Sequence, residues 1–300
     1  MKSAERSINR LAVLETALPR IVVAPSFVAM VVFIYGFILW TLYISMTKSS
    51  FLPSYDFVGL TNYFKLWRID RWWVAVRNLL VYGGLFIFCC TLLGLFLAIF
   101  LDQKIRIEGA LRTIYLYPLA LSFVVTGTAW KWILNPGLGI ERLVRQWGWS
   151  TFTFDWLVTS EMAIYCVVIA AVWQSSGFVM AMFLAGLRGI DDAVIKAAQV
   201  DGASLPRIYR KIIIPSLRPV FFSTVIILTH IAIKSFDLVV VLTRGGPGYA
   251  SDLPATFMYS YAFTRGQLAM GAASAMMMFF MVMAVIVPYL YSELRRKRYA

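Results

Sequence analysis

Three ionisable residues stand within one long apolar run in the last third of the chain. His230, Lys234 and Asp237 follow one another at i, i+4 and i+7, and Ser223 precedes them by two further helical turns. On one continuous helix these positions share a face, and Lys234 and Asp237 are within reach of each other. Charged groups inside an apolar span are costly and usually face a cavity or a partner rather than lipid. Two interpretations stay open: an internal ion pair, or a polar stripe that hydrogen-bonds a solute.

A second polar group lies in another apolar run, where Trp173 is followed directly by Gln174, Ser175 and Ser176. Amide and hydroxyl groups beside an aromatic face are suited to binding polyhydroxylated solutes. The same side chains also form ordinary hydrogen bonds between helices. The candidate substrate path therefore consists of Trp173, Gln174, Ser176, His230, Lys234 and Asp237.

The sequence holds no catalytic or metal-binding pattern. His230 is its only histidine, and the three cysteines lie inside apolar segments without metal-ligand spacing. No Gly-x-x-x-x-Gly-Lys-Ser/Thr phosphate loop occurs, so the chain is not expected to bind ATP in the usual way. We predict that it is not an enzyme and binds no metal or cofactor itself. If transport is driven by ATP, a separate subunit must bind ATP and magnesium.

The composition places these residues in a membrane. The chain of 300 residues is 60% hydrophobic and 14% charged, which is more apolar surface than a soluble domain of this length can bury. Six runs are long enough to cross a hydrocarbon layer of about 30 Å as helices. The six expected spans are Ile21–Met46, Leu79–Leu101, Thr113–Asn135, Met162–Leu187, Val220–Thr243 and Leu268–Tyr291. In the second, Gly94 and Ala98 are four residues apart, which fits either a close helix contact or chance.

The basic residues predict the orientation of the spans. With six spans, the N-terminus, the second and fourth loops and the C-terminal tail lie on one side and carry most of the Lys and Arg residues. The first loop, which includes Arg71, is an exception. Because cytoplasmic loops are enriched in Lys and Arg, both termini are expected in the cytoplasm. The net charge of +13 lies in loops between apolar runs and so favours anionic lipid over nucleic acid.

A polar, basic stretch at 188–218 interrupts the apolar runs. Asp191 predicts a helix start, and Gly202 predicts a break because glycine tolerates positive φ. Ser204 predicts the cap of a second helix, which Pro215 is expected to end. The expected apolar face of this second helix consists of Leu205, Ile208, Tyr209, Ile212 and Ile213. Taken alone, the stretch also fits an amphipathic loop lying on the membrane surface.

This stretch resembles the coupling signature of permease subunits in binding-protein-dependent ABC importers. That signature reads Glu-Ala-Ala, three residues, Gly, nine residues, Ile, one residue, Leu-Pro. Ala197, Ala198, Gly202, Ile212 and Pro215 fall in register with it, while Lys196 replaces the Glu and Ile214 the Leu. The resemblance implies that the loop docks on an ATPase subunit. The implied coupling residues are Lys196, Ala197, Ala198, Asp201, Gly202, Ala203, Ile212 and Pro215.

Two further segments resemble the sugar-importer branch of these permeases, of the maltose and glycerol-phosphate type. The turn Gly245-Gly246-Pro247 resembles its external Gly-Gly-Pro turn, and Val58-Gly-Leu-Thr-Asn62-Tyr63 resembles its VGL-x-NY segment. The resemblance implies half of a heterodimeric pore in the bacterial inner membrane. The implied partners are a homologous second permease subunit, two ATPase subunits, a periplasmic sugar-binding protein and the lipid bilayer, but no nucleic acid.

The expected fold is therefore all-α and integral to the membrane, with six spans and a cytoplasmic helix-turn-helix coupling loop. The expected division is a cytoplasmic segment 1–20, a permease domain 21–291 with its loop at 188–218, and a cytoplasmic basic tail 292–300. The expected function is that of a permease subunit of an ATP-driven sugar importer. The alternative is an ion-driven secondary transporter that uses His230, Lys234 and Asp237 as a proton relay; a membrane enzyme is a third possibility.

Overall fold

A computed structural model describes residues 2–103 and 105–298 of the chain. Lys104 of the second loop and residues 299–300 of the expected tail lie outside the described residues. Within the described part, the backbone is mainly helical, and its only β-pairing is an isolated bridge between Thr47 and Phe57. The all-α prediction is confirmed.

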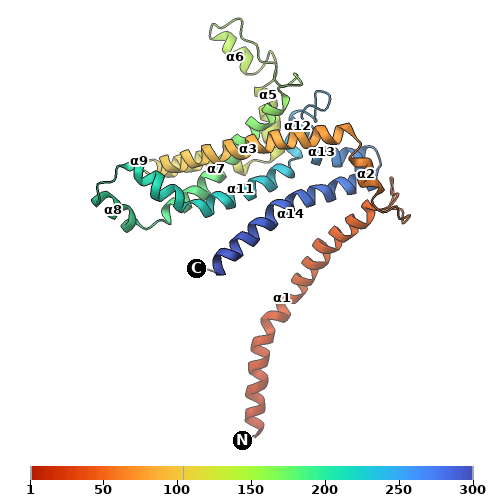
Figure 1. Cartoon of the computed structure of the whole chain (residues 1–300), viewed down its shortest axis with the longest axis vertical. Helices are drawn as coiled ribbons and strands as arrows, with labels where there is room; N and C mark the ends of the chain where they lie inside the picture. The colour runs from red at the N-terminus through yellow and green to blue at the C-terminus, as the bar shows by residue number, and fades with distance from the viewer. Residues whose placement is uncertain (1, 104, 299–300) are drawn as a thin grey trace.

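Four described helices are long and apolar enough to cross a membrane, and two bent helix pairs raise the number of candidate spans to as many as six. The four long helices are α1 (Lys2–Ser45), α3 (Asp70–Asp102), α7 (Ala163–Arg188) and α14 (Leu268–Arg298). Figure 1 shows α3, α7, α11 and α14 side by side, while α1 runs away from them. The second span begins nine residues earlier than the sequence predicted, at Asp70 rather than Leu79.

The first bent pair replaces the single straight span expected at Thr113–Asn135. It consists of α4 (Glu108–Leu116), the 3-10 turn η1 (Tyr117–Ala120) and α5 (Phe123–Ile133). The two parts meet at 100°. Pro118 lies in the turn, Leu121 is extended, and Ser122 restarts the chain as a helix by accepting a hydrogen bond from the Val125 amide at 3.3 Å. A proline followed by a new N-cap therefore breaks this span.

The second bent pair brings residues 205–216 into the fifth span. A nearly continuous stretch is formed by α9 (Leu205–Ile208), the π-helix η2 (Tyr209–Ile213) and α10 (Ile214–Ser216). It bends by 59° into α11 (Arg218–Ile233). A second break separates α11 from α12 (Asp237–Leu242). The expectation of one unbroken helix over Val220–Thr243 is therefore wrong.

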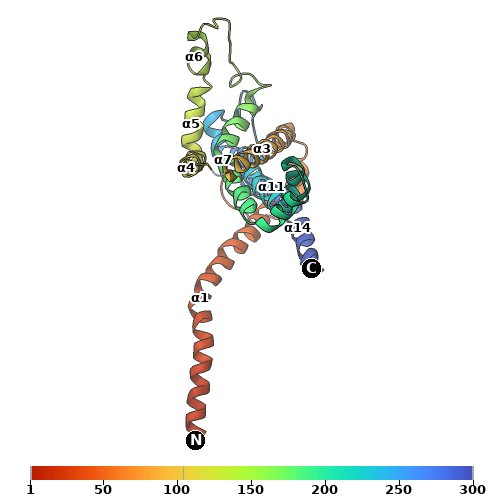
Figure 2. The same ribbon diagram turned by 90° about the vertical axis from the view of Figure 1, so that its left-hand side faces the viewer.

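The core lies between α3, α7 and α11. In the most apolar stretch of α7, 67% of the residues are buried. In the corresponding stretch of α1, no residue is buried, so α7 is central and α1 is peripheral. A Cβ atom on Gly94 would lie 2.5 Å from Val179 Cγ1 and 2.9 Å from the Met180 amide nitrogen. Only glycine permits this approach of α3 to α7, which favours a close helix contact over chance, the two alternatives that the sequence left open. Figure 2 shows α3, α7 and α11 clustered, with α1 extending away alone.

The end of α1 is fixed by the VGL-x-NY segment. Asn62 in α2 (Thr61–Leu66) is buried and donates hydrogen bonds to the carbonyls of Ser45 and Thr47, both at 2.8 Å. The Tyr63 hydroxyl lies 2.7 Å from Ser45 Oγ. These bonds satisfy carbonyls that the end of a helix would otherwise leave unpaired.

The segment between α5 and α7 forms an excursion that carries α6 (Ile140–Gln146) away from the bundle (Figure 1). Glu141 holds it together, because its carboxylate accepts hydrogen bonds from the Phe154 amide at 3.1 Å and the Gly137 amide at 3.3 Å. Arg145 pairs with the same carboxylate at 2.7 Å. The Phe154 and Gly137 amides and the Arg145 charge hold the pKa of Glu141 below its ordinary value.

Candidate functional site

The first helix of the 188–218 stretch is α8 (Asp192–Val200), and it begins where the sequence predicted. Asp191 has extended backbone dihedrals and accepts a hydrogen bond from the Ala193 amide at 2.8 Å. An aspartate in this position satisfies an otherwise unpaired amide and favours the positive end of the helix dipole. The predicted N-cap is confirmed.

The turn after α8 has the hydrogen bonds of a Schellman motif. The Ala203 amide donates to the Ala198 carbonyl and the Gly202 amide donates to the Gln199 carbonyl, each at 3.0 Å. Gly202 has φ +75°, and a Cβ atom there would meet nothing within 4 Å. The requirement for glycine therefore comes from the left-handed backbone and not from crowding.

The second half of the stretch packs one side on the core. Ile208 and Ile213 are buried, whereas Leu205 is 62% exposed and so does not belong to the apolar face predicted for it. Ser204 has the backbone of an N-cap but makes no capping hydrogen bond, so the predicted side-chain cap is absent. The helical path also continues past Pro215 to Ser216 before it bends.

The outer side of the stretch is a mixed basic and apolar surface. Four of the implied coupling residues are exposed: Lys196, Ala197, Asp201 and Gly202. The other four are half-buried: Ala198, Ala203, Ile212 and Pro215. Val200 is 88% exposed, Leu205 62% and Val194 49%. Val194 and Val200 were not identified from the sequence, and Leu205 was assigned to the apolar face, because the resemblance marks only positions within the signature. Exposed apolar residues gathered on one short segment are typical of a protein-binding surface.

An ionic contact ties the start of this stretch to two other helix ends. Arg188, the last residue of α7, donates from Nη2 to Glu108 Oε1 at 2.5 Å and lies 3.9 Å from Asp102 Oδ1. Glu108 begins α4 and Asp102 ends α3. The sequence gives Arg188 only as a basic residue of the 188–218 stretch, since nothing nearby in the chain identifies acidic partners about eighty residues away. The contact fixes the point from which the 188–218 stretch leaves the bundle.

The substrate-path candidates of α7 have different environments. The ring of Trp173 is partly exposed and meets Trp130 of α5 edge-on, with 5.9 Å between the ring centroids. Gln174 is buried and its side-chain amide donates to the Leu121 carbonyl at 2.8 Å. This bond gives a hydrogen-bond partner to a backbone carbonyl at the break between η1 and α5. Ser176 is half-buried. Gln174 is thus a structural support for the bend, and Trp173 is the more accessible of these side chains.

The structure does not place His230, Lys234 and Asp237 on one helical face. His230 lies in the last turn of α11, Lys234 follows its end, and Asp237 begins α12. All three are exposed, and none of the ion pairs found among the described residues joins Lys234 to Asp237. The stripe geometry and the internal ion pair are therefore both wrong. The three residues instead surround an exposed break in the helix.

The turn at Gly245, Gly246 and Pro247 is ordered by its own hydrogen bonds. Ser251 Oγ lies 2.7 Å from both the Gly246 carbonyl oxygen and Thr243 Oγ1, and its one hydroxyl hydrogen can be donated to either acceptor. Gly245 has φ +79°, and the bond between Gly246 and Pro247 is cis. The turn is therefore one defined structure rather than a loose hairpin.

The turn is joined to the start of α3 by a buried ion pair. Arg71 Nε lies 2.6 Å from Asp252 Oδ2, with the two side chains 13% and 2% exposed. The Thr256 hydroxyl donates to Asp252 Oδ1 at 2.5 Å, and Arg71 also donates to Ser260 Oγ at 3.0 Å. The Arg71 guanidinium lies 4.3 Å from the centroid of the Tyr249 ring. Arg71, an exception to the charge pattern of the loops, is thus a structural residue with its own partner.

These arrangements offer contact surfaces and hydrogen-bonding groups rather than a reaction centre. Among the described residues, no group of three or more His, Cys, Asp or Glu side chains is placed to hold a metal ion. Cys90 and Cys166 are buried and unpaired, and Cys89 is half-buried. The fold defines a multi-pass α-helical membrane protein in which a helical segment interrupts the apolar spans and leaves an exposed surface.

Comparison with known proteins gives the family. Residues 90–298 match the family described as binding-protein-dependent transport system inner membrane component. The chain is 41% identical over 269 residues to a probable ABC transporter permease protein of Pyrococcus horikoshii, covering 89% of this chain and 92% of that protein. It is 39% identical over 276 residues to the xylose/arabinose import permease protein of Haloferax volcanii, covering 90% and 86%. The chain belongs to this family of permeases, which argues against the ion-driven alternative.

The fold agrees with this assignment. A bacterial ABC transporter involved in the import of the acidic polysaccharide alginate contains a chain of the same fold, with a TM-score of 0.80 and 18% sequence identity. The match covers 97% of this chain and 99% of that one. A trehalose/maltose transport system permease protein of Thermococcus litoralis is 29% identical over 283 residues, which cover 94% and 95% of the two chains.

Proposed function

We propose that this chain is the transmembrane permease subunit of an ATP-driven sugar importer, in which it forms half of the translocation path. The observation that carries the proposal is family membership together with relatives named for xylose, arabinose, trehalose and maltose. Sugar import also suits the exposed side chains near the helix break, since hydroxyl-rich solutes need several hydrogen-bonding partners.

The 191–215 segment is the proposed coupling element. It offers a helix of nine residues, a fixed turn and a second helix that continues through a bend into α11. A force applied at the exposed side of α8 would reach α11 through this backbone without a flexible linker. Val194, Val200 and Leu205 supply apolar contact area beside the family positions. The expected docking partner is an ATPase subunit on the cytoplasmic side.

The proposed assembly contains a homologous second permease subunit, two ATPase subunits and a periplasmic sugar-binding protein. ATP and magnesium are assigned to the ATPase subunits, because this sequence has no phosphate loop. The binding-protein partner is supported by the family description and by a bacterial alginate ABC transporter of the same fold, whose structure includes a periplasmic protein bound to an alginate pentasaccharide. We place the chain in the inner membrane with both termini, segments 1–20 and 292–300, in the cytoplasm.

The test of this function is uptake by the reconstituted importer. Proteoliposomes would contain the complete complex, with ATP inside and no ion gradient, and would receive labelled pentoses or glucose disaccharides together with the binding protein. We expect uptake that depends on both ATP and the binding protein. Uptake that needs an ion gradient and ignores ATP would contradict the proposal.

The topology gives a first prediction. Single cysteines would be introduced at Ser204 and Ser150, both exposed, in a protein whose three native cysteines are replaced. A membrane-impermeant maleimide added to intact cells or spheroplasts should label the cysteine at position 150, in the α6 excursion, and not that at 204. Lysed membranes provide the control, in which both positions should react. Labelling of position 204 from outside would overturn the orientation.

The helix break gives a second prediction. Lys234 and Asp237 are exposed and have no ion-pair partner among the described residues, so Lys234→Gln and Asp237→Asn should change the melting temperature little. If the two side chains line the sugar path, each variant should still reduce ATP-driven uptake about tenfold, because about 1.4 kcal/mol corresponds to that factor and one hydrogen bond to a charged group is worth about that much. Lys65→Gln, which removes the charge of an exposed lysine in α2, is a matched control. Unchanged uptake would remove both residues from the path.

A further inference from the structure

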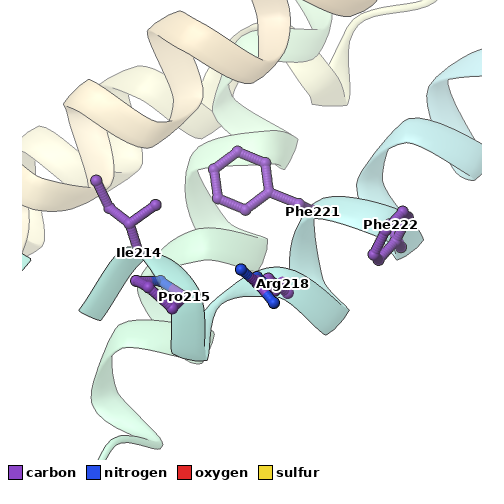
Figure 3. A pocket seen from close by; sticks show the side chains of 5 residues that line it. All are labelled: Ile214, Pro215, Arg218, Phe221 and Phe222. Atoms are coloured by element: carbon purple, nitrogen blue, oxygen red, sulfur yellow. The ribbon is translucent and has the colours of Figure 1, made fainter. Parts of the chain in front are cut away.

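A cavity of about 490 Å³ lies at the bend between α10 and α11. It is lined by Ile214, Pro215, Arg218, Phe221 and Phe222, and Figure 3 shows these side chains around the bend, with Phe221 directed toward the neighbouring helices. Four of the five are apolar, so the lining combines one cation with hydrocarbon walls. The cavity lies where the 188–218 stretch joins α11, the point at which the polar stretch meets an apolar candidate span.

Arg218 supplies a free positive charge to this cavity. Its side chain is exposed, and none of the ion pairs or side-chain hydrogen bonds found among the described residues involves it. It is the first residue of α11, where Pro219 has no amide hydrogen and the first backbone bond is donated by Phe221 to Leu217. Because α10 ends at Ser216, directly before α11, the opposite ends of two helix dipoles meet at this bend. The Arg218 guanidinium is therefore the charge that favours a phosphate over a neutral group.

A second, apolar groove of about 460 Å³ shares Phe221 with this cavity. It lies between α3 and α11, and its other lining residues include Phe88, Leu92 and Leu95 of α3 and Val225 of α11. From Phe88 to Leu95 the groove follows α3 for about 10 Å, at a rise of 1.5 Å per residue. Phe88 is 63% exposed and Leu92 42%. An apolar groove that continues from a cationic cavity suits an amphiphile, which has a charged headgroup and a hydrocarbon chain.

We propose that this pair of cavities binds an anionic phospholipid. The phosphate lies against Arg218, and one acyl chain passes Phe221 and follows the groove between α3 and α11. A sugar is a poor occupant, because recognition of hydroxyl groups requires several polar side chains and the two cavities offer very few. Basic pockets beside membrane spans select anionic headgroups by charge. The proposal is independent of which solute the protein carries.

The site adjoins the bend that connects the 191–215 segment to α11. A lipid held on both sides of Leu217 would stabilise this 59° bend, so the occupied state favours the geometry seen here. Anionic lipid is then expected to alter transport through the permease in addition to filling the cavity. An effect of anionic lipid on transport would distinguish a specific lipid site from a general attraction of the basic loops to the membrane.

The test uses photoreactive phosphatidylglycerol and phosphatidylcholine with identical acyl chains, each present as a minor lipid in nanodiscs that contain the assembled importer. After illumination, the cross-linked peptides would be identified by mass spectrometry. We expect phosphatidylglycerol to label α3 and α11 peptides around Leu92 and Val225 in preference to phosphatidylcholine. Arg218→Gln should lower this labelling about fivefold, the loss expected for one basic residue at an anionic surface.

Two control variants make the result interpretable. Arg210→Gln removes an exposed charge from the same basic stretch outside the cavity lining, and should leave groove labelling by phosphatidylglycerol unchanged. Leu92→Trp fills the apolar groove and should reduce labelling by both lipids. Equal labelling by the two lipids in the wild-type protein, or an unchanged preference in Arg218→Gln, would overturn the proposal. Cross-links from the groove to a protein subunit instead of lipid would assign it to an interface and also overturn it.

Discussion

Replacing Arg71 by alanine should destabilise the protein more than removing any exposed basic residue. The substitution leaves the carboxylate of Asp252, which is 2% exposed, without its cationic partner at 2.6 Å. Breaking a buried pair on one side costs about 3–5 kcal/mol, because the remaining charge stays buried and uncompensated. It also removes the contact with Ser260 and the packing of the guanidinium on the Tyr249 ring. We expect a melting temperature lower by several degrees and a poorly ordered Gly245–Asp252 turn.

Two variants separate the charge effect from general damage. Arg77→Ala removes an exposed arginine two turns further along α3 and should change the melting temperature little. Arg71→Met combined with Asp252→Leu removes both charges and should recover much of the stability lost by Arg71→Ala, since no lone charge remains. The measurement is thermal unfolding of the purified complex in detergent. If the double variant is less stable than Arg71→Ala, the unpaired charge of Asp252 is not the cause of the stability lost in Arg71→Ala.

Replacing Gly202 by valine should abolish transport while leaving the protein inserted in the membrane. Gly202 has φ +75°, and a left-handed conformation costs a residue with a side chain about 1–2 kcal/mol, most of all a β-branched one. The turn can relieve that strain only by giving up the hydrogen bonds from Ala203 to Ala198 and from Gly202 to Gln199. The two helices then lose their fixed relation. We expect binding to the ATPase subunit to weaken roughly tenfold, since about 1.4 kcal/mol corresponds to that factor.

The matched control is Gly202→Asn, because the side chain of asparagine is similar in size to that of valine. Asparagine is the residue that best tolerates the left-handed region after glycine, and no neighbour lies within 4 Å of a Cβ atom there. This variant should keep most of the ATPase binding and transport. Co-purification of the ATPase subunit and sugar uptake in proteoliposomes are the two readouts. Normal uptake by Gly202→Val would contradict a coupling role for the turn.

Properties set by local physics were predictable from the sequence. The membrane class follows from the length and hydrophobicity of the apolar runs, which depend on no distant contact. The start of α8 at Asp191 and the turn at Gly202 follow from the side chain and the φ preference of single residues. Family membership was evident for the same reason, since its signature lies within one short segment.

Pro118 and Ser122 are local signals of a helix break, but the angle of the first bend and the interruption at 234–236 were decided by the tertiary structure. A run of apolar residues has the same hydropathy whether it is straight or bent, so the 100° bend between η1 and α5 left no mark on the hydrophobic pattern. The bend is stabilised by Gln174 of α7, which donates to the Leu121 carbonyl 53 positions away. The interruption at 234–236 likewise removed the shared face of His230, Lys234 and Asp237, which existed only on an ideal continuous helix.

The pairing of charges was also decided by the tertiary structure. Arg71 and Asp252 are separated by 181 positions, and Arg188 and Glu108 by 80. From the sequence, Arg71 counted only as one more basic residue in a loop that disagreed with the charge pattern of the others. The hydrophobic pattern determined by itself that the chain enters a membrane and where its polar segments lie. Only the packing of α3 against the Gly245–Asp252 turn decided that Arg71 is buried with a partner, because a Coulomb interaction depends on distance in space and not along the chain.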